Sequence, residues 1–458
     1  MLVNDSILNK VIDQALSMGA DFAEVYVEDT RKRDFSYLNS QPEKAITGHT
    51  SGAGIRIFSG TEQIYTYTND LTEEGLLRAA KLAAAALKAS GQSQIIRPKE
   101  LELFGSPQPS KAKTSDIQWA SLKLMDQTAR EHSSLITQVT AGLSETQKNV
   151  QIFNSEGTNR QEGRNYVFAM AQAIAEENGQ RESGYERTAF LGTADDWQKV
   201  DFKDLANQAA AQALRILRAD WAPAGEMPVL IDNGFGGVIF HEACGHGLET
   251  TSVAKNASVF CGKLGEKVAN ECVTAIDDGT LPGDYGSLQI DDEGEPTRKT
   301  VLIENGILKS YIVDKMGARK TGYAITGSGR RQDYRFAPTS RMRNTFIAAG
   351  KSSFDEMLKD IDYGLYAKNM GGGSVSPGTG SYNFAVNEAF IVRNGKIEKQ
   401  VKGASLIGTG IETLGRIVKV GQDLKLSPGT CGSISGLIPT TVGQPALLVS
   451  KLTVGGKV

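Results

Sequence analysis

The stretch VLIDNGFGGVIFHEACGHGLE, residues 229–249, decides how the second half of the chain is organised. Its first four residues are typical of a short buried strand, and Gly234 to Glu249 is helix-like. From about residue 227 the sequence is otherwise rich in glycine and in strand patterns, with hairpin-forming NG pairs at 305–306 and 394–395. The sequence therefore predicts a β-rich, mainly antiparallel C-terminal domain at 225–458, whose first helix carries two histidines.

The part of the chain before residue 227 has the same order of elements twice: a helix, several strands and a second helix. Predicted helices bound each set, at 5–18, 71–90, 116–131 and 200–218. A connector rich in Pro, Ser and Lys, at 92–115, separates the sets. We interpret the sets as similar units or a divergent duplication. The predicted fold class is α+β, with an N-terminal α/β domain at 1–95 and a middle α/β domain at 115–219.

The composition is that of a water-soluble globular protein. The 458 residues are 40% hydrophobic and 22% charged, and the net charge of −3 offers no basic surface for nucleic acid or an anionic membrane. The four cysteines lack a CxxC spacing, which argues against a disulfide framework and for a reducing compartment. With no apolar signal region and no run of about 18 apolar residues, we expect a cytoplasmic protein without a membrane span.

His241 and His246, with Glu242 beside the first, form a candidate metal site. The histidines are five positions apart, which places them about 140° out of phase on a regular α-helix. They can converge on one ion only if the helix is widened or broken near Ala243 to Gly245, as in a π-type bulge. In the alternative, Glu242 and His246 are the ligands and His241 supports them from outside. A glutamate next to a metal-binding histidine is, however, the usual general base of a metallopeptidase.

A catalytic zinc needs a third protein ligand, and several residues are candidates. Glu249 follows His246 by three positions, and Cys244 lies inside the motif but on a different side from His241. Cys431 lies in SPGTCGSISG, a polar loop with no reason of its own to bury a thiol. Cys261 and Cys272 have the surroundings of ordinary buried thiols.

Several stretches resemble the TldD/PmbA family of metallopeptidases, and specifically its TldD-like branch with an HExxxH motif. His241, Glu242 and His246 match that motif, and CGSISGLIPTTVGQPALLVSKLTVGG resembles the family segment that begins with a distant cysteine ligand. Further similar stretches include GAGIRIFSGTEQIYTYTNDLT, GSGRRQDYRFAPTSRMRNTFIAAG, GGGSVSPGTGSYNFAVNEAF and KGASLIGTGIETL, so the resemblance covers nearly the whole chain. It implies that His241, His246 and Cys431 hold Zn²⁺ and that Glu242 is the catalytic base.

The resemblance also implies a substrate and a partner. The substrate would be an unfolded or short peptide, cleaved with low sequence selectivity, and the partner a second copy or a paralogue without the motif. Two alternatives remain: a non-catalytic scaffold subunit, or a zinc hydrolase of a non-peptide amide.

Two further groups of residues are candidates for substrate binding. Arg330, Arg331 and Tyr334, together with Arg341 and Arg343, could contact substrate carbonyls or a C-terminus, although such charge runs are usually solvated faces. Gly371, Gly372 and Gly373 could form an edge where an extended peptide adds as a strand, although such a run is also typical of a flexible loop.

Overall fold

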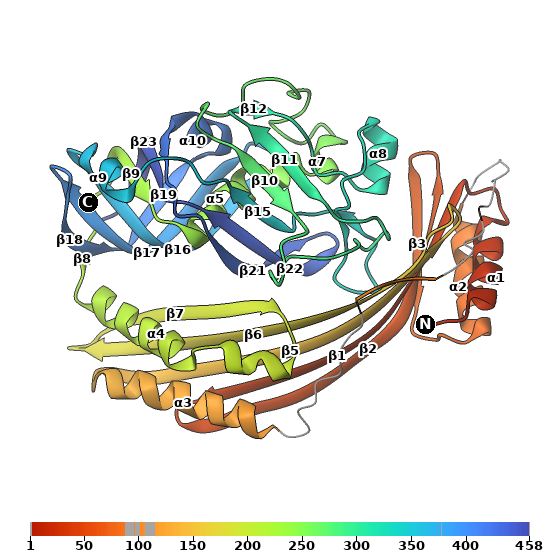
Figure 1. Ribbon diagram of the computed structural model, residues 1–458, viewed down its shortest axis with the longest axis horizontal. Coiled ribbons are helices and arrows are strands. Elements are labelled where there is room, and N and C mark those ends of the chain that lie inside the picture. The colour runs from red at the N-terminus through yellow and green to blue at the C-terminus, as the bar shows by residue number, and fades with distance from the viewer. Residues whose placement is uncertain (1, 88–95, 97–100, 106–114, 377, 458) are drawn as a thin grey trace.

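A computed structural model of the chain describes residues 2–87, 96, 101–105, 115–376 and 378–457 (Figure 1). The α+β class predicted from the sequence is confirmed, because helices cover mostly antiparallel sheets in both halves. Most of the connector predicted at 92–115 lies outside the described residues, as does the predicted boundary at residue 95. The limits of the three predicted domains remain predictions.

One sheet runs through the first half of the chain. In its described part it has seven strands, most of them long and antiparallel, and β1 pairs with β5 from Glu24–Asn154 to Leu38–Thr140. Both predicted N-terminal units therefore contribute to a single sheet. The order is β3 (Glu62–Thr68), β2 (Gln41–Ser59), β1 (Phe22–Leu38), β5 (Ile136–Asn154), β6 (Asn159–Glu177) and β4 (Glu102–Phe104), and β7 (Gln180–Leu191) also pairs with β6.

Two pairs of helices pack at opposite ends of this sheet (Figure 1). The pairs are α1 (Asp5–Leu16) with α2 (Glu73–Ala86), and α3 (Asp116–His132) with α4 (Phe202–Leu217), the last preceded by η1 (Ala194–Lys199). The buried face of α4 is rich in alanine, which lets the helix approach the sheet closely. A Cβ on Gly184 would lie 2.0 Å from the carbonyl oxygen of Ala209, so this glycine lets α4 lie directly on β7.

The second half of the chain contains two larger sheets and a small one. The eight-stranded sheet is ordered β16 (Tyr363–Ser376), β9 (Gly225–Ile231), β23 (Leu447–Gly455), β19 (Ala404–Thr409), β17 (Ser381–Arg393), β18 (Lys396–Lys402) and β8 (Asp220–Trp221), with β20 (Ile417–Val420) on β23. The six-stranded sheet is ordered β12 (Ile307–Leu308), β11 (Lys299–Glu304), β10 (Ala275–Asp278), β15 (Asn344–Ile347), β22 (Gly436–Gln444) and β21 (Lys425–Ser433). A third pair is β13 (Gly329–Arg330) and β14 (Thr339–Ser340).

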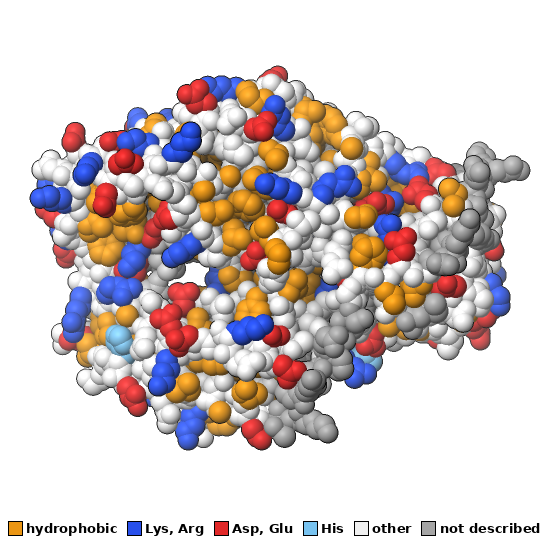
Figure 2. All heavy atoms as spheres, viewed as in Figure 1, with side chains coloured by type: hydrophobic (Ala, Val, Ile, Leu, Met, Phe, Trp, Pro, Cys, Tyr) orange, Lys and Arg blue, Asp and Glu red, His pale blue; other side chains and the backbone are white. Residues whose placement is uncertain are grey.

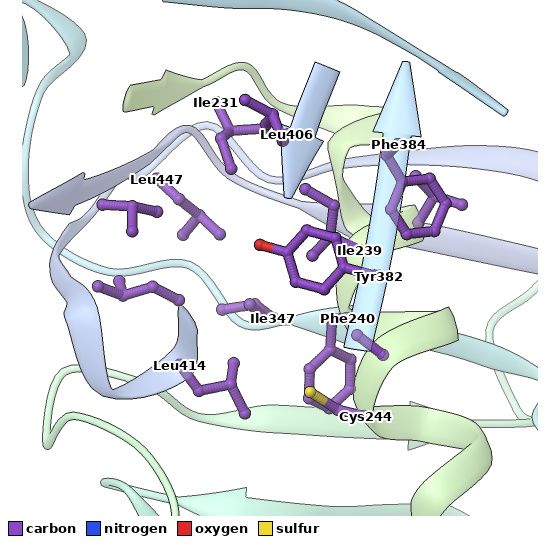
Figure 3. Close-up of a cluster of buried hydrophobic side chains, with 14 of the residues drawn as sticks. Ile231, Ile239, Phe240, Cys244, Ile347, Tyr382, Phe384, Leu406, Leu414 and Leu447 are labelled. Atoms are coloured by element: carbon purple, nitrogen blue, oxygen red, sulfur yellow. The ribbon is translucent and has the colours of Figure 1, made fainter. Parts of the chain in front are cut away.

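Short helices fill the space around these sheets. A broken helical segment follows β9 and consists of η2 (Gly234–Gly237), α5 (Val238–Phe240), η3 (His241–Gly245), α6 (His246–Leu248) and α7 (Thr250–Val253). The others are α8 (Lys315–Thr321), α9 (Phe354–Lys359) and α10 (Gly410–Arg416). Figure 3 shows Phe240 and Cys244 of the broken helix among Ile231, Leu447 and Ile347. The helix is thus held in a core to which both larger sheets contribute.

A buried network of charges joins the N-terminal sheet to the C-terminal half. Arg56 of β2 contacts Glu24 of β1 at 2.9 Å and Glu293 at 2.7 Å, and Arg331 contacts the other oxygen of Glu24 at 2.8 Å. Arg164 of β6, in the same sheet, contacts Asp292 of the C-terminal half at 2.6 Å. Burial of unpaired charges is costly, so these pairs fix how the two halves meet. No helix among the described residues is both long and apolar enough to cross a bilayer.

Candidate metal centre

The helix that carries both histidines is irregular at the predicted place. His241 to Gly245 forms a π-helical turn, in which the N–H of His246 bonds to the carbonyl of His241 five residues earlier. That wider turn brings residues at i and i+5 into line, so the distortion expected for two converging histidines is present. Gly245 allows the segment between β14 and β15 to pack against this turn, because a Cβ there would lie 2.1 Å from Sδ of Met342.

His241, His246 and Cys431 converge. Their candidate ligand atoms all lie within 4.8 Å of one another, and the three residues are 1%, 9% and 3% exposed. Sγ of Cys431 is 3.1 Å from Nε2 of His241 and 3.4 Å from Nε2 of His246. Ligands at ordinary Zn–N and Zn–S distances in a tetrahedron are about 3.5 Å apart, so this donor set fits zinc. It is also the only such group of three or more His, Cys, Asp or Glu in the described part of the chain.

The electrostatics of the cluster favour a thiolate. Burial opposes ionisation of the Cys431 thiol, but the adjacent His241 and His246 rings outweigh it and lower its pKa to about 3. Burial likewise opposes protonation of His246, yet Glu249 and Cys431 together raise the pKa of its ring well above the usual value. A thiolate beside two imidazoles is a soft donor set of the kind that transition metals such as zinc select.

The two glutamates near His246 have different surroundings. Oε2 of Glu249 lies 3.0 Å from Nδ1 of His246 and the side chain is 3% exposed, so this carboxylate orients the ring and leaves Nε2 facing Cys431. The Glu242 side chain is 31% exposed, and its Oε2 lies 3.6 Å from Nε2 of His246. Glu242 and His241 both line a cavity of about 340 Å³. Glu242 thus has access to the cavity, whereas Glu249 lies buried behind the cluster.

The β21–β22 hairpin positions Cys431. In the register of the pair, Cys431 lies opposite Ile438. The Arg341 guanidinium donates to the carbonyl of Cys431 at 2.7 Å, and to Oγ of Ser435 and the carbonyl of Gly436 at 2.9 and 3.0 Å. Arg341 therefore fixes the hairpin from within the protein, a task that the sequence did not reveal because no local pattern links it to Cys431.

The other predicted substrate-binding residues fall into two groups. Arg330 donates to the carbonyl of Met342 at 2.9 Å, Arg331 belongs to the buried charge network, and Tyr334 packs edge-on against Tyr67. None of the three lines the cavity that holds His241 and Glu242. Gly372 and Gly373 do line it, while Gly371 and Gly372 line an adjoining cavity of about 360 Å³.

The remaining cysteines are not brought to the cluster. Cys244 points into the apolar core beside Phe240 (Figure 3), and burial raises the pKa of its thiol. Cys261 and Cys272 donate weakly to the carbonyls of Val253 and Ile417. All four cysteines are free thiols.

Several residues that line the cavity were not identified from the sequence. Phe168 of β6, Tyr185 and Arg187 of β7, and Phe235 of η2 line the cavity with His241. The first three come from the N-terminal sheet, more than fifty positions before the motif. No pattern around them signals a site, because only the packing of the two halves brings them there.

Comparison with known proteins gives consistent matches along the chain. Three family models match: PmbA/TldA metallopeptidase domain 1 at 23–87, the central domain at 106–217 and the C-terminal domain at 224–456. A metalloprotease TldD homolog of Haemophilus influenzae is 36% identical, covering 99% of this chain and 97% of that protein. Metalloprotease MJ0996 of Methanocaldococcus jannaschii is 31% identical, covering 94% and 96%.

Solved structures with the same fold were also found. A Thermotoga maritima protein described as a modulator of a DNA gyrase has a TM-score of 0.80 at 22% identity, covering 98% of this chain and 100% of that one. TldE of Thermococcus kodakarensis has a TM-score of 0.78 at 20% identity, with the same coverage. At these identities, the two structures support the fold alone.

Proposed function

Because the chain belongs to the PmbA/TldD family of metallopeptidases, we propose that it is a zinc-dependent peptidase that cleaves unfolded or short peptides with low sequence selectivity. One observation carries the proposal. The rings of His241 and His246 and the sulfur of Cys431 meet at hydrogen-bond distances next to a cavity into which a glutamate opens. A scaffold subunit would have no need for three buried metal-binding side chains next to a carboxylate that is open to the cavity.

In this proposal His241, His246 and Cys431 hold the zinc ion, and Glu249 keeps Nδ1 of His246 engaged. When bound, zinc supplies a Lewis acid that acidifies water and polarises a carbonyl group. Glu242 accepts a proton from the attacking water and then returns a proton to the leaving amine of the peptide. Its position supports this role, because its carboxylate is 3.6 Å from His246 yet partly open to the cavity.

The low selectivity is proposed to come from backbone recognition along β16. Gly372 and Gly373 line the cavity, and a Cβ on Gly372 would meet nothing within 4 Å, so an extended chain can come close there. A peptide that pairs with a strand edge is held by main-chain hydrogen bonds rather than by its side chains. Such binding excludes folded proteins, whose backbones are already paired.

We also propose an oligomeric state and a cellular location for the protein. The active assembly is a dimer, either with a second copy or with a paralogue that lacks the HExxxH motif. The free cysteines support a reducing, cytoplasmic setting.

The test combines metal analysis with a substrate panel. We expect the purified protein to hold one zinc per chain and to cleave unstructured peptides, and we expect a chelator to abolish cleavage until zinc is restored. Zinc without peptide cleavage, but with turnover of small non-peptide amides, would favour the amide hydrolase. Absence of stoichiometric zinc together with absence of cleavage would favour the scaffold. The assay is repeated with a motif-less paralogue added, because the partner could be required.

A further inference from the structure

Arg187 lies where two cavities of the described structure adjoin. The cavity of about 340 Å³ that holds His241 and Glu242 and the cavity of about 360 Å³ beside it share the lining residues Tyr185, Arg187, Phe235 and Gly372. Among the described lining residues of both, Arg187 is the only lysine or arginine. Figure 2 shows that the molecule is hollowed between the N-terminal sheet and the C-terminal half. A ligand that reaches the metal cluster from the second cavity passes this side chain.

The protein holds the Arg187 guanidinium in one orientation. Its Nε–H donates to the carbonyl of Pro428 at 2.8 Å, three residues before Cys431 on β21. The guanidinium carbon lies 4.3 Å from the centre of the Phe235 ring and 5.7 Å from that of Tyr185. A stacked guanidinium with one donor occupied keeps both terminal nitrogens in a fixed plane. Within the described residues, neither of those nitrogens has a hydrogen-bond partner.

Arg187 also makes no salt bridge within the described chain, although its charge acts through space on the neighbouring Glu186 carboxylate. Buried Arg56, Arg164 and Arg331 each contact at least one carboxylate. No described carboxylate lies within salt-bridge distance of the Arg187 guanidinium. The adjacent Glu186 instead accepts the backbone N–H of Arg187 through Oε1 at 3.3 Å. A partly buried cation that the protein orients but does not pair is suited to an anionic ligand, and a planar fork of donors matches a carboxylate.

We propose that Arg187 binds a carboxylate of the peptide substrate, and so makes the enzyme prefer peptides that present a carboxylate beside the scissile bond. The carboxylate is either the free C-terminus of the peptide or an acidic side chain near the cleaved bond. This inference rests on the proposed peptidase function and adds one preference, for a carboxylate, to its otherwise low sequence selectivity. Arg187 is a specificity residue here, because Glu242 and the metal cluster carry out the chemistry.

The test measures binding so that it does not depend on hydrolysis. Zinc-loaded Glu242→Gln protein is titrated with three versions of one short unstructured peptide: with a free C-terminal carboxylate, with a C-terminal amide, and with the amide and one internal glutamate. We expect the free acid or the internal-glutamate peptide to bind at least about tenfold more tightly than the plain amide, as for a charge-assisted hydrogen-bonded pair. Whichever version binds more tightly identifies the source of the carboxylate.

A second variant assigns the preference to Arg187. Arg187→Gln, made in the Glu242→Gln background, should bind all three peptides with the affinity of the plain amide. Arg187→Lys should keep part of the preference, because it keeps the charge. The matched control is Arg181→Gln, an exposed arginine on the same strand, and it should leave the preference unchanged.

Three outcomes would overturn the inference. Equal affinity of the parent for all three peptides overturns it and leaves the proposed peptidase function intact. A preference that survives Arg187→Gln also overturns it, because another group must then bind the carboxylate. If none of the peptides binds the zinc-loaded protein, either alone or with the motif-less paralogue added, the inference and the proposed function fail together. The unfolding midpoint of each variant is measured alongside. If Arg187→Gln does not fold, the affinities of Arg187→Lys and of the parent for the three peptides decide whether Arg187 binds the carboxylate.

Discussion

Glu242 and Glu249 illustrate how position alone gives two carboxylates different tasks. Both lie within one helical turn of His246, but only Glu242 is open to the cavity, at 31% side-chain exposure against 3% for Glu249. A general base must reach water and substrate, whereas an orienting partner must be immobile. The surroundings therefore favour Glu242 as the base and Glu249 as the support for the ring.

The first prediction concerns Glu242→Gln. The amide keeps the shape of the side chain but cannot accept the proton of the attacking water. We expect zinc content to stay at the parental level and the rate of peptide hydrolysis to fall by about 10²–10⁴-fold. Stopped-time peptide assays and metal analysis on the same preparation check this. The control is Glu398→Gln at an exposed strand position, and cleavage by Glu242→Gln at the parental rate would remove Glu242 as the base.

The second prediction concerns Cys431→Ser. A hydroxyl is a far weaker zinc ligand than the thiolate, and removal of mere supporting partners already costs 10–100-fold in metal affinity. We expect zinc affinity to fall by more than about 100-fold, measured by competition with a chromogenic chelator. Cys261→Ser, at a partly buried thiol away from the cluster, should bind zinc as the parent does. Unchanged affinity of the Cys431 variant would return Glu249 to consideration as the third ligand.

The two histidines could be predicted as a candidate metal site from the residues, and Cys431 became the expected third ligand through the family resemblance. His241, Glu242 and His246 form a local pattern, and Cys431 is marked by an unusual thiol in a polar segment followed by a family-like stretch. Arg187 could not be predicted, since its significance depends on the stacking with Phe235 and on a bond to Pro428, which lies 241 positions away. Arg330 and Arg331 are the opposite case: their sequence resembles a charged surface, but the fold buries both at 2% exposure.

The π-helical turn is the element on which the site depends. In a regular α-helix, His241 and His246 would point in different directions, whereas the wider turn aligns them. The backbone hydrogen bond in this turn joins residues five positions apart, whereas the bonds of an α-helix join residues four apart. Tertiary packing must therefore hold the turn in place. Met342, Phe240 and Cys244 supply that packing in the core.

The third prediction concerns Gly245→Ala. A methyl group there would meet Sδ of Met342 at 2.1 Å, so the turn or the Met342 segment must move. We expect a loss of about 1–3 kcal/mol in the free energy of unfolding, as for overpacked cores, together with weaker zinc binding. Denaturant unfolding and zinc titration measure the two effects. The control is Gly415→Ala in α10, where a Cβ would meet nothing within 4 Å. Equal behaviour of the two variants would show that the turn tolerates displacement.

At the level of elements, the sequence indicated helices and strands better than their pairing. The helix–strands–helix order of the first half and the β-rich second half are both present. The pairing of β1 with β5 was not foreseen, because each set of strands has its own turn signals and nothing in either set marks the other as its neighbour. Long-range register depends on which apolar faces meet in the folded chain.

For the whole molecule, the buried charge network makes stability depend on pH. Glu293 belongs to the C-terminal half and is fully buried against Arg56 of β2. Burial, reinforced by nearby acids, raises its pKa to about 7 despite Arg56. The folded state therefore holds a proton on Glu293 that the unfolded state, with an ordinary pKa near 4.5, has already lost. This stability contribution is complete below about pH 4.5 and is lost as the pH rises through about 7.

The fourth prediction is that Glu293→Gln flattens this dependence. The neutral amide cannot ionise, so the loss of stability between about pH 5 and 7 should shrink by on the order of 1–3 kcal/mol, whatever the variant does to absolute stability. Denaturant unfolding of parent and variant across that range gives the two slopes. Glu304→Gln, at an exposed acid of β11, should keep the parental slope. If the free energy of unfolding of Glu293→Gln falls with pH as steeply as that of the parent, a neighbouring acid and not Glu293 takes up the proton.

The most direct measurement is zinc-edge X-ray absorption on the purified, zinc-loaded protein, compared with Cys431→Ser. We predict one zinc per chain with a first shell of two imidazole nitrogens at about 2.0 Å, one sulfur at about 2.3 Å and one further light atom, and loss of the sulfur in the variant. A first shell without sulfur, or a sulfur that persists in Cys431→Ser, would contradict the assignment of His241, His246 and Cys431 as the metal site.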